Sequence, residues 1–518
     1  MKIGIISINM YSKYLNFACP LHTFAFQQFL LKKGYKSTVI NYQPIYFNGF
    51  DMEHPYTYYK NCLKKLKKGN PLKVKKIKDY EQKKNDFKKI YKEREIRYNK
   101  FQDFIDNNYL KTEKCYNSAS LEVESLDFDC YICVTDVIWK NEPHEGFDRG
   151  FFLGSSCMEN KLKISYSASR GVNFAKTEEE QKEFFKYIND IDCISVREES
   201  LKRYIEENSN KKANVVLDPV LLHNEDFWNK YIKKPKEKEY LFLYYVVEKA
   251  TDTIEEAIKF AEKNDLTIIE VTDRPLKYGR VPKNSKVKHK YLYDIGLEEW
   301  LGYIKYASYI FTNSFHGCCF SIIFKKNFFV GKRNGDKVTH LLEMFNLSNR
   351  YFNNNLEVLS SNPSIDYDNV YKILDEKKSI SENFIIEAVN KKVRKEKDYS
   401  KDKKNQRYKM IYISKKRSSL NDKVNNIESY EVEEKQLNNG ENHLLPNMFK
   451  SNKYIFSHWI IYILIDKDWF YYTKDKNLIN VKDYKEEELY RFSSNDFIPY
   501  FPVNGIKKVV AEAIWESN

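Results

Sequence analysis

The sequence has 518 residues, too many for one hydrophobic core, so we expect at least two core-bearing domains. Apolar residues make up 42% of the chain and aromatic residues 16%, which excludes a disordered protein. Lys and Arg number 87 against 73 Asp and Glu, a formal net charge of +14, but the excess is concentrated in residues 64–94 and 391–415. We interpret these stretches as solvated surface and expect no nucleic-acid partner.

The cysteine pattern argues against both a disulfide scaffold and a zinc site. Nine cysteines are few for this length, and the odd number cannot be fully paired. Cys130 and Cys133 form the C-x-x-C motif of an apolar run with no second pair nearby, which favours a buried strand. We therefore expect no metal site and no bound cofactor.

The N-terminus and the apolar runs predict a protein without a membrane span. Residues 1–8 form a short apolar run that resembles a first strand more than a signal peptide. The longest later candidate, Trp459–Ile465, is far shorter than the ~18 residues of a spanning helix. We expect a cytoplasmic location, and the basic surface is compatible with peripheral contact with the inner face of the membrane.

Short β-branched runs alternate with amphipathic stretches along most of the chain. This alternation predicts parallel sheets with helices on both faces, here two Rossmann-like, doubly wound domains that face a cleft. The expected strands are residues 2–7, 36–40, 131–135, 162–167, 193–196, 215–217, 240–247, 266–271 and 309–313. The expected helices are residues 21–33, 79–107, 178–189, 253–262 and 297–306, with another that begins near 314.

Changes in composition predict the domain boundaries. The charged helix 79–107 interrupts the alternation and is interpreted as a flap or a plain solvated helix, to which we assign no chemistry. A polar, proline-containing stretch, 224–238, separates the two series of elements. The predicted parts are an N-terminal domain 1–223 with an insertion at about 43–126, a second domain 239–390, a linker 391–442 and a small β-containing module 443–518 of unknown role.

The stretch 307–324 carries the most chemical information. An apolar strand ends near Thr312, and an apolar helix follows after a short polar turn. Because strand ends form the ligand crevice of a parallel sheet, the turn residues Asn313, Ser314, His316 and Gly317 are expected there. The helix N-terminus favours an anion such as phosphate, and His316 can change its charge near neutral pH. A core histidine is the alternative.

Other polar residues follow predicted strands of the first domain. Arg197 follows the strand 193–196, where a guanidinium suits a carboxylate or phosphate, although it could instead pair with Glu198 or Glu199 on the surface. Asp136 could accept a hydrogen bond from a sugar hydroxyl. Trp139 could stack on a sugar ring or fill a core. Asn16 lies in the loop after the first strand and is a further candidate.

Several common enzyme motifs are absent from the sequence. It contains no G-x-G-x-x-G after the first strand, no Walker A loop, no H-E-x-x-H and no G-x-S-x-G. Dinucleotide oxidoreductases, P-loop kinases, zincins and serine hydrolases are therefore disfavoured.

Six segments, in order, resemble motifs of the polysaccharide pyruvyl transferase family. Residues 16–27 are similar to its N-Y-G-A-x-L-Q-A-Y-A-L-Q, residues 134–139 to its G-S-D-Q-x-W, and residues 163–171 to a strand that ends in A-A-S-x-G. The other three segments are Ile194–Leu201, Leu217–Leu221 and Thr312–Gly317. The resemblance extends to about residue 350 and ends before residue 379.

The resemblance implies a GT-B-like fold and transfer of a pyruvyl group from phosphoenolpyruvate to a sugar of a cell-surface polysaccharide or its precursor. Phosphoenolpyruvate is then a co-substrate, and the acceptor is a sugar or a lipid-linked oligosaccharide. His316 would supply the proton, and Arg197 and the helix N-terminus would hold the donor. Lys332 and Arg333 would be secondary phosphate ligands. A late helix, 381–393, would cross back onto the first domain.

Differences from the family motifs keep two alternatives open. They lie on the expected acceptor side, at Ala18, His22, Val134, Thr135 and Val137. The chain could be a nucleotide-sugar glycosyltransferase on the same fold. It could also be a non-catalytic protein that binds glycan precursors.

Overall fold

The computed structural model describes most of the chain. The described residues are 1–8, 15–44, 85, 87–391 with gaps at 119, 125, 143–145, 172–174, 247–249, 274–275, 277–278, 283–284 and 353–356, then 409–414, 428–431 and 454–517 with gaps at 466–467, 475–477, 484 and 494–505. Within these ranges, no helix combines the length and apolarity needed to cross a bilayer.

The chain divides into two compact units. The larger unit holds residues 1–115, 127–154 and 161–393, and the smaller holds 116–126, 155–160 and 394–518. Both predicted Rossmann-like domains lie in the larger unit, so their mutual contacts are those of a single body.

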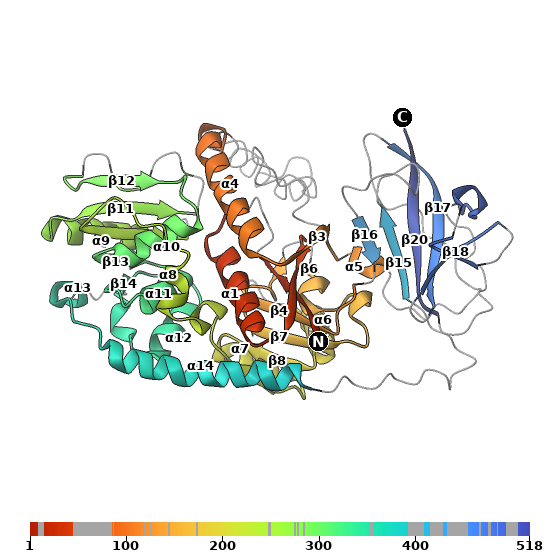
Figure 1. The fold of residues 1–518 in the computed structure, drawn as a ribbon, viewed down its shortest axis with the longest axis horizontal. Coiled ribbons are helices and arrows are strands. Elements are labelled where there is room, and N and C mark those ends of the chain that lie inside the picture. Colours follow the sequence, from red (N-terminus) through yellow and green to blue (C-terminus); the bar gives the residue numbers. More distant parts are fainter. Residues whose placement is uncertain are drawn as a thin grey trace. The chain divides into compact units, whose positions relative to one another are not determined.

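The first parallel sheet occupies the N-terminal half of the larger unit (Figure 1). Its strand order is β3-β2-β1-β4-β7-β8-β9, and every pairing from β2 to β9 is parallel. The strands are β1 (Lys2–Ser7), β2 (Lys36–Tyr42), β3 (Lys111–Tyr116), β4 (Cys130–Asp136), β7 (Leu162–Ala168), β8 (Cys193–Val196) and β9 (Ala213–Val215). Its helices are α1 (Ala18–Lys32), α4 (Tyr91–Asn108), α6 (Glu178–Asp190), α7 (Glu199–Asn208) and the 3₁₀ turns η3 (Arg149–Phe152) and η5 (Pro219–Leu222). A small hairpin joins β5 (Asn141–Glu142) to β6 (Gly146–Phe147).

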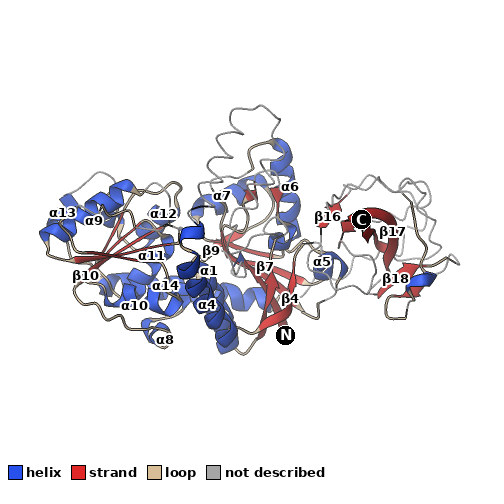
Figure 2. Cartoon of the chain, turned by 90° about the horizontal axis from the view of Figure 1, so that it is seen from above, coloured by secondary structure: helices blue, strands red, loops and turns tan. Residues whose placement is uncertain are grey.

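The second parallel sheet has the order β12-β11-β10-β13-β14. Its strands are β10 (Tyr240–Tyr245), β11 (Thr267–Thr272), β12 (His289–Leu292), β13 (Tyr309–Thr312) and β14 (Phe328–Val330). Its helices are α8 (Glu225–Asn229), α9 (Thr251–Lys263), α10 (Leu297–Tyr306), α11 (Phe315–Ile323), α12 (Lys337–Met344), η6 (Ser348–Arg350), α13 (Glu357–Ser361) and α14 (Tyr367–Val389). Figure 2 shows helices on both faces of both sheets, so the predicted pair of doubly wound domains is confirmed.

One apolar core joins the two domains. Phe17, at the start of α1, stacks on Trp300 of α10 with ring centroids 5.4 Å apart, and it meets Tyr244 of β10 edge-on at 6.0 Å. These rings belong to a buried cluster that also contains residues of β1, β4 and β7. Because apolar burial is the main stabilising term, the domains are held together by the same core that folds them.

Helix α14 spans both domains, as predicted for the late segment (Figure 1). The Ser381 hydroxyl accepts a hydrogen bond from the Leu217 amide at 2.9 Å. Glu382 pairs with Lys33 of α1 at 2.8 Å. The C-terminal half of α14 is therefore fixed to the first domain.

The insertion is not a plain solvated helix. The part from residue 45 to 84 lies outside the described residues, but α4 buries Arg97, Phe101, Phe104 and Ile105, and β3 joins the sheet. The Arg97 guanidinium lies 4.6 Å from the Phe17 ring centroid and 3.9 Å from that of Tyr293. It donates to the carbonyls of Thr272, at 3.0 Å, and Tyr293. A helix of the first domain thus satisfies backbone groups of the second.

The smaller unit contains a six-stranded sheet of order β16-β15-β20-β17-β18-β19. Its strands are β15 (Lys409–Ser414), β16 (Glu428–Glu431), β17 (Tyr454–Ile465), β18 (Asp468–Tyr472), β19 (Leu478–Asn480) and β20 (Ile506–Ser517). Short turns complete it: α5 (Ser120–Val123), η4 (Ser156–Met158) and η8 (Glu486–Glu488). Buried Lys508 pairs with buried Glu122.

The smaller unit corrects the predicted linker. Strands β15 and β16 lie within 391–442, and β15 pairs in parallel with β20, so the module begins before residue 443. Strand β15 is a short apolar run, Met410–Ile413, inside a Lys- and Asn-rich stretch, so the composition of the stretch as a whole did not indicate it. Much of the remaining linker prediction falls outside the described residues.

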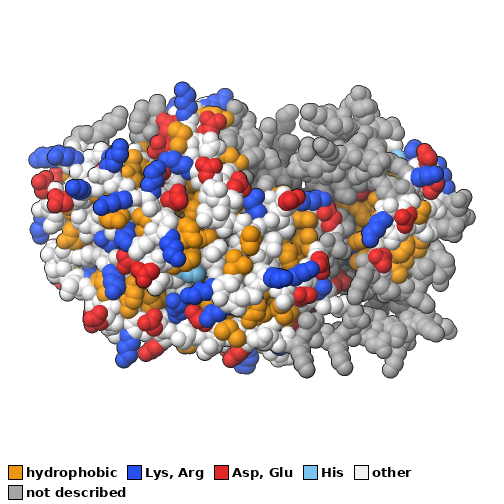
Figure 3. All heavy atoms as spheres, in the orientation of Figure 1, with side chains coloured by type: hydrophobic (Ala, Val, Ile, Leu, Met, Phe, Trp, Pro, Cys, Tyr) orange, Lys and Arg blue, Asp and Glu red, His pale blue; other side chains and the backbone are white. Residues whose placement is uncertain are grey.

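Charged side chains are mixed on the surface. Figure 3 shows Lys and Arg interspersed with Asp and Glu over the described part of the face drawn. Most of the Lys-rich stretches 64–94 and 391–415 lies outside the described residues, so their interpretation as solvated surface stays a prediction.

Replacing Arg97 with Met should destabilise the larger unit by about 2–3 kcal/mol, because buried carbonyls lose charged donors while the apolar stem is kept. Urea unfolding followed by tryptophan fluorescence measures the change. The matched control is Lys100→Met on the same helix; its pair with Glu299, 2.7 Å apart, is partly exposed and should be worth less than about 1 kcal/mol. Equal effects of the two changes would contradict the role of Arg97 in joining the two domains.

Candidate active site

Strand ends from the two sheets bring the polar residues together. Asp136 ends β4, Arg197 directly follows β8, and His316 lies in the first turn of α11 after β13. Thr135 and Asp136 have φ values of 40° and 59°, uncommon for residues other than glycine. The two residues stand at the end of β4, whose last pairing with β7 joins Asp136 to Ala168.

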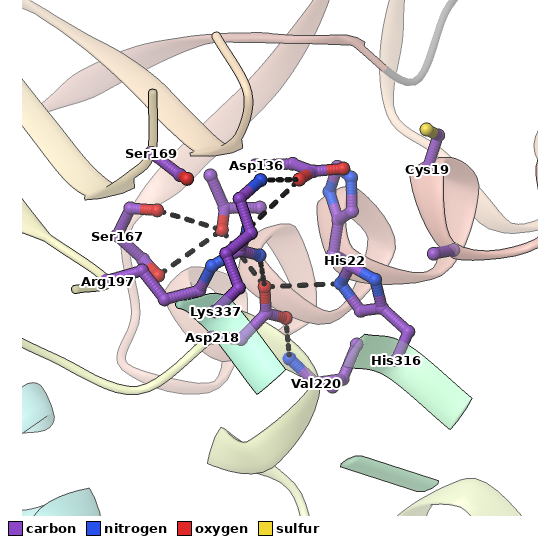
Figure 4. A network of polar contacts seen from close by, with 12 residues as sticks. Cys19, His22, Asp136, Ser167, Ser169, Arg197, Asp218, Val220, His316 and Lys337 are labelled. Carbon is purple, nitrogen blue, oxygen red and sulfur yellow. Dashed lines mark hydrogen bonds and ion pairs between the residues drawn. The ribbon is translucent and has the colours of Figure 1, made fainter. Parts of the chain in front are cut away.

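Asp218 is the centre of this cluster (Figure 4). Its Oδ2 accepts hydrogen bonds from Thr135 Oγ1 at 3.0 Å, from Arg197 Nη1 at 3.0 Å and from His316 Nε2 at 3.2 Å. Its Oδ1 accepts from the Val220 amide, which caps the turn η5. The side chain is fully buried. Burial opposes its ionisation, but His316 and Arg197 outweigh burial and lower the pKa of Asp218 far below the usual value.

Arg197 is surrounded by carboxylates. Besides Asp218, it donates to Asp136 Oδ1 from Nη2 at 3.0 Å and to Glu198 Oε1 from Nε at 3.2 Å. Its guanidinium carbon lies 4.2 Å from the centroid of the Phe315 ring. Arg197 and His316, from the two domains, both bind Asp218 Oδ2. Each of the three guanidinium nitrogens has one carboxylate partner, so a direct grip on a donor would have to use the remaining N–H groups of Nη1 and Nη2.

Lys337 is a cation that the sequence prediction missed. It begins α12, and its Nζ lies 3.5 Å from Asp136 Oδ1. Its side chain keeps 15% exposure, and burial lowers its pKa. Burial disfavours the charge of Asp136 too, but Lys337 and Arg197 together hold its pKa well below the usual value.

His316 is nearly buried and held by Asp218, with Phe315 edge-on beside it at 5.1 Å between ring centroids. A second histidine, His22 of α1, faces it at 5.6 Å between ring centroids. Burial lowers the pKa of His22 to about 4, so this ring is neutral at pH 7.

The turn before α11 has the predicted form. The Ser314 hydroxyl accepts from the Gly317 amide at 3.2 Å and caps the helix. A Cβ on Gly317 would lie 2.6 Å from Thr312 Oγ1, so glycine is required for this close approach. Asn313 Oδ1 accepts from the Val246 amide at 3.0 Å. Asn313 and Ser314 thus build the turn that positions His316.

The remaining predicted residues are more dispersed. Arg333 Nη1 donates to the Asn313 carbonyl at 3.0 Å, whereas Lys332 is exposed. Asn16 Nδ2 donates to Asp273 of the second domain at 2.7 Å, and its Oδ1 accepts from the amides of Ala18 and Cys19. Asn16 therefore caps α1 and bridges the domains.

Trp139 is not a sugar-stacking residue. Its side chain is fully buried, its ring stacks on Phe152 at 5.6 Å, and its Nε1 donates to the Phe151 carbonyl at 3.2 Å. The core alternative is correct, because no face of the ring is open to a ligand.

One group of residues has donor atoms suited to a metal ion. Ligand atoms of Cys19, His22 and Asp136 lie within 4.8 Å of one another. The sequence prediction contained no metal site, because Asp136 is far from the other two in sequence. The C-x-x-H spacing of Cys19 and His22, which places both on one helix face, was the available signal.

Replacing Asp218 with Asn should destabilise the larger unit by about 3–5 kcal/mol, because buried Arg197 loses a carboxylate partner. The pKa of Asp218 is lower in the folded protein than in the unfolded chain. Its carboxylate therefore stabilises the fold at pH values above about 4, and this stabilisation is lost as the pH falls. Stability should therefore fall less steeply with decreasing pH in the variant. Urea unfolding at several pH values measures both effects.

The control is Asp106→Asn, whose carboxylate is 59% exposed beside Lys111 and should be worth less than about 1 kcal/mol. If Asp218→Asn resembled this control, Asp218 would not be the centre of the cluster.

Comparison with known proteins identifies the family. The solved structures it matches include UDP-N-acetylglucosamine 2-epimerase from Rickettsia bellii, with 11% identity, a TM-score of 0.39 and coverage of 75% of this chain and 95% of that one. Another is UDP-GlcNAc 2-epimerase from Neisseria meningitidis bound to UDP-GlcNAc, with 10% identity, a TM-score of 0.37 and coverage of 75% and 99%. At these scores the likeness supports no conclusion about this chain. No match was found among curated proteins.

The family model for polysaccharide pyruvyl transferase, however, matches residues 21–330, more than half of the chain and parts of both parallel sheets. The chain belongs to the polysaccharide pyruvyl transferase family and is a transferase.

Proposed function

We propose that the protein transfers a pyruvyl group from phosphoenolpyruvate to a sugar of a cell-surface polysaccharide or its lipid-linked precursor and forms a pyruvate ketal. One observation carries the proposal: a histidine of the second domain and an arginine of the first meet on one buried carboxylate, Asp218. The family match supports the transfer of pyruvate.

His316 is the proposed proton donor. Asp218 fixes the ring through Nε2. We find no partner of Nδ1 among the described residues, so this nitrogen can face the donor. His316 gives a proton to the enol methylene carbon, which makes the adjacent carbon electrophilic, and one sugar hydroxyl adds to that carbon and returns its proton to His316. The bond to phosphate then breaks as a second hydroxyl of the same sugar closes the ketal, and the leaving phosphate takes the proton of this hydroxyl.

The phosphate and carboxylate of phosphoenolpyruvate need cationic partners whose charge is not already balanced by several protein carboxylates. Arg197 is shared by three carboxylates, so it mainly positions Asp136 and Asp218. Lys337 has one carboxylate 3.5 Å away and keeps some exposure. Arg333 donates to a neutral carbonyl. Lys337 and Arg333 are therefore the proposed ligands of the phosphate and carboxylate.

Replacing His316 with Asn should lower kcat by about 10²–10⁴-fold, the usual contribution of a general acid, with little change in the binding of phosphoenolpyruvate. Mass spectrometry of the sugar product and release of inorganic phosphate give the readouts. His458→Asn, in the smaller unit, is the control. A hexosyl mass increment with release of a nucleotide would replace this proposal with the glycosyltransferase alternative.

Lys337→Met should raise KM for phosphoenolpyruvate by about 10–100-fold, the equivalent of one lost charged hydrogen bond. Lys263→Met, at an exposed position at the end of α9, is the control and should change KM by less than the Lys337 variant. Binding of phosphoenolpyruvate can be followed independently by calorimetry. Identical KM values in the two variants would show that the donor does not use Lys337.

A further inference from the structure

The first turns of α1 carry a set of donor atoms that the proton-transfer mechanism does not use. Cys19 and His22 are three positions apart on the helix, so their side chains leave from the same face. Asp136, at the end of β4, approaches that face. The sulfur, an imidazole nitrogen and a carboxylate oxygen lie within 4.8 Å of one another (Figure 4).

His22 has a ring nitrogen that is left without a hydrogen-bond partner within the described part of the chain. The residue is fully buried, and Nε2 has no hydrogen-bond partner among the described residues. Leaving a buried nitrogen unpaired is costly, so the position calls for a ligand. The other ring nitrogen, Nδ1, lies 3.2 Å from Thr23 Oγ1, whose hydroxyl also lies 2.7 Å from Ser7 Oγ. When the Thr23 hydroxyl donates to Ser7, it accepts from Nδ1, and the lone pair is then on Nε2.

Asp136 is oriented in a comparable way. Its Oδ1 is held by Arg197 at 3.0 Å and lies 3.5 Å from Lys337, so the carboxylate plane is fixed and the second oxygen is left for another partner. Metal ligands are commonly oriented by outer contacts of this kind.

We propose that Cys19, His22 and Asp136 bind one Zn²⁺ ion, with a fourth position open to an oxygen ligand. A thiolate, an imidazole and a carboxylate together suit a borderline-soft divalent ion, and three protein ligands with one open position are typical of catalytic zinc. Tetrahedral Zn²⁺ keeps its ligand atoms roughly 3.3–3.8 Å apart, so side-chain movements of the order of 1 Å complete the site. Cys19 loses its proton to solvent when the ion binds.

The open position lies close to the proposed proton donor, because the rings of His22 and His316 are 5.6 Å apart. A sugar hydroxyl bound there would become more acidic and would be placed for addition to the pyruvyl carbon. This role rests on the proposed function, whereas binding of the ion does not.

Titration of the metal-stripped full-length protein with Co²⁺ tests the assignment without any substrate. We expect one equivalent to bind and to produce the near-ultraviolet charge-transfer band of a thiolate–cobalt bond. The band should disappear in Cys19→Ser and His22→Gln. It should persist in the matched controls Cys133→Ser and His223→Gln, which change a buried cysteine and a buried histidine outside the cluster. Thr23→Val should weaken Co²⁺ binding by about 10-fold through loss of the outer contact.

Wild-type protein without the band, or a Cys19→Ser variant that retains it, would overturn the assignment, and the wild-type result decides even if a variant fails to fold. The product assay is separate. Cobalt binding without a pyruvylated product would leave the metal site standing and refute the proposed function, whereas pyruvyl transfer by a protein that binds no cobalt at this cluster would do the reverse.

Discussion

The buried carboxylate of Asp218 is the interaction on which the site depends. Burying a guanidinium is costly without compensating groups, and Arg197 obtains compensating charge from Asp218, Asp136 and Glu198. Asp218 also holds His316, which belongs to the other domain. Loss of this one carboxylate would leave a buried cation under-compensated and an imidazole without its anchor. Asp218 therefore balances the buried charge of Arg197 and, through His316, links the two domains at the same point.

Charge balance also decides which groups remain for a substrate. With three carboxylates around it, Arg197 acts on the site mainly through the residues it holds. Lys337, by contrast, is partly exposed at the start of α12, where the free amide groups of the helix also favour an anion. A substrate with two anionic groups would approach that side of the cluster. His316 is held by the same Asp218 and lies close to His22 (Figure 4).

The sequence predicts those parts of this structure that depend on local pattern. Alternating apolar runs give both parallel sheets, and the polar turn 313–317 gives the cap and tight approach at the start of α11. It could not show that Arg197 binds three carboxylates, because Asp136 and Asp218 are distant from it in sequence and meet it only through the sheet order. The position of Lys337 beside Asp136 was not predicted for the same reason. Trp139 was misassigned because an indole after a strand has the same local pattern whether it faces a ligand or the Phe152 ring.

Helix α1 connects the domain core to the site chemistry. Asn16 caps its first amides and reaches Asp273, while Phe17 is clamped between Trp300 and the Arg97 guanidinium. Pro20 is tolerated in the first turn because an amide there has no partner within the helix. The next positions on this anchored segment are Cys19 and His22. Asn16 and Phe17 bind the second domain through Asp273 and Trp300, so the separation between His22 and His316 is set by the packing of α4 and α10 around Phe17. A change that loosens this aromatic core would therefore alter the geometry of the site without touching any of its polar residues.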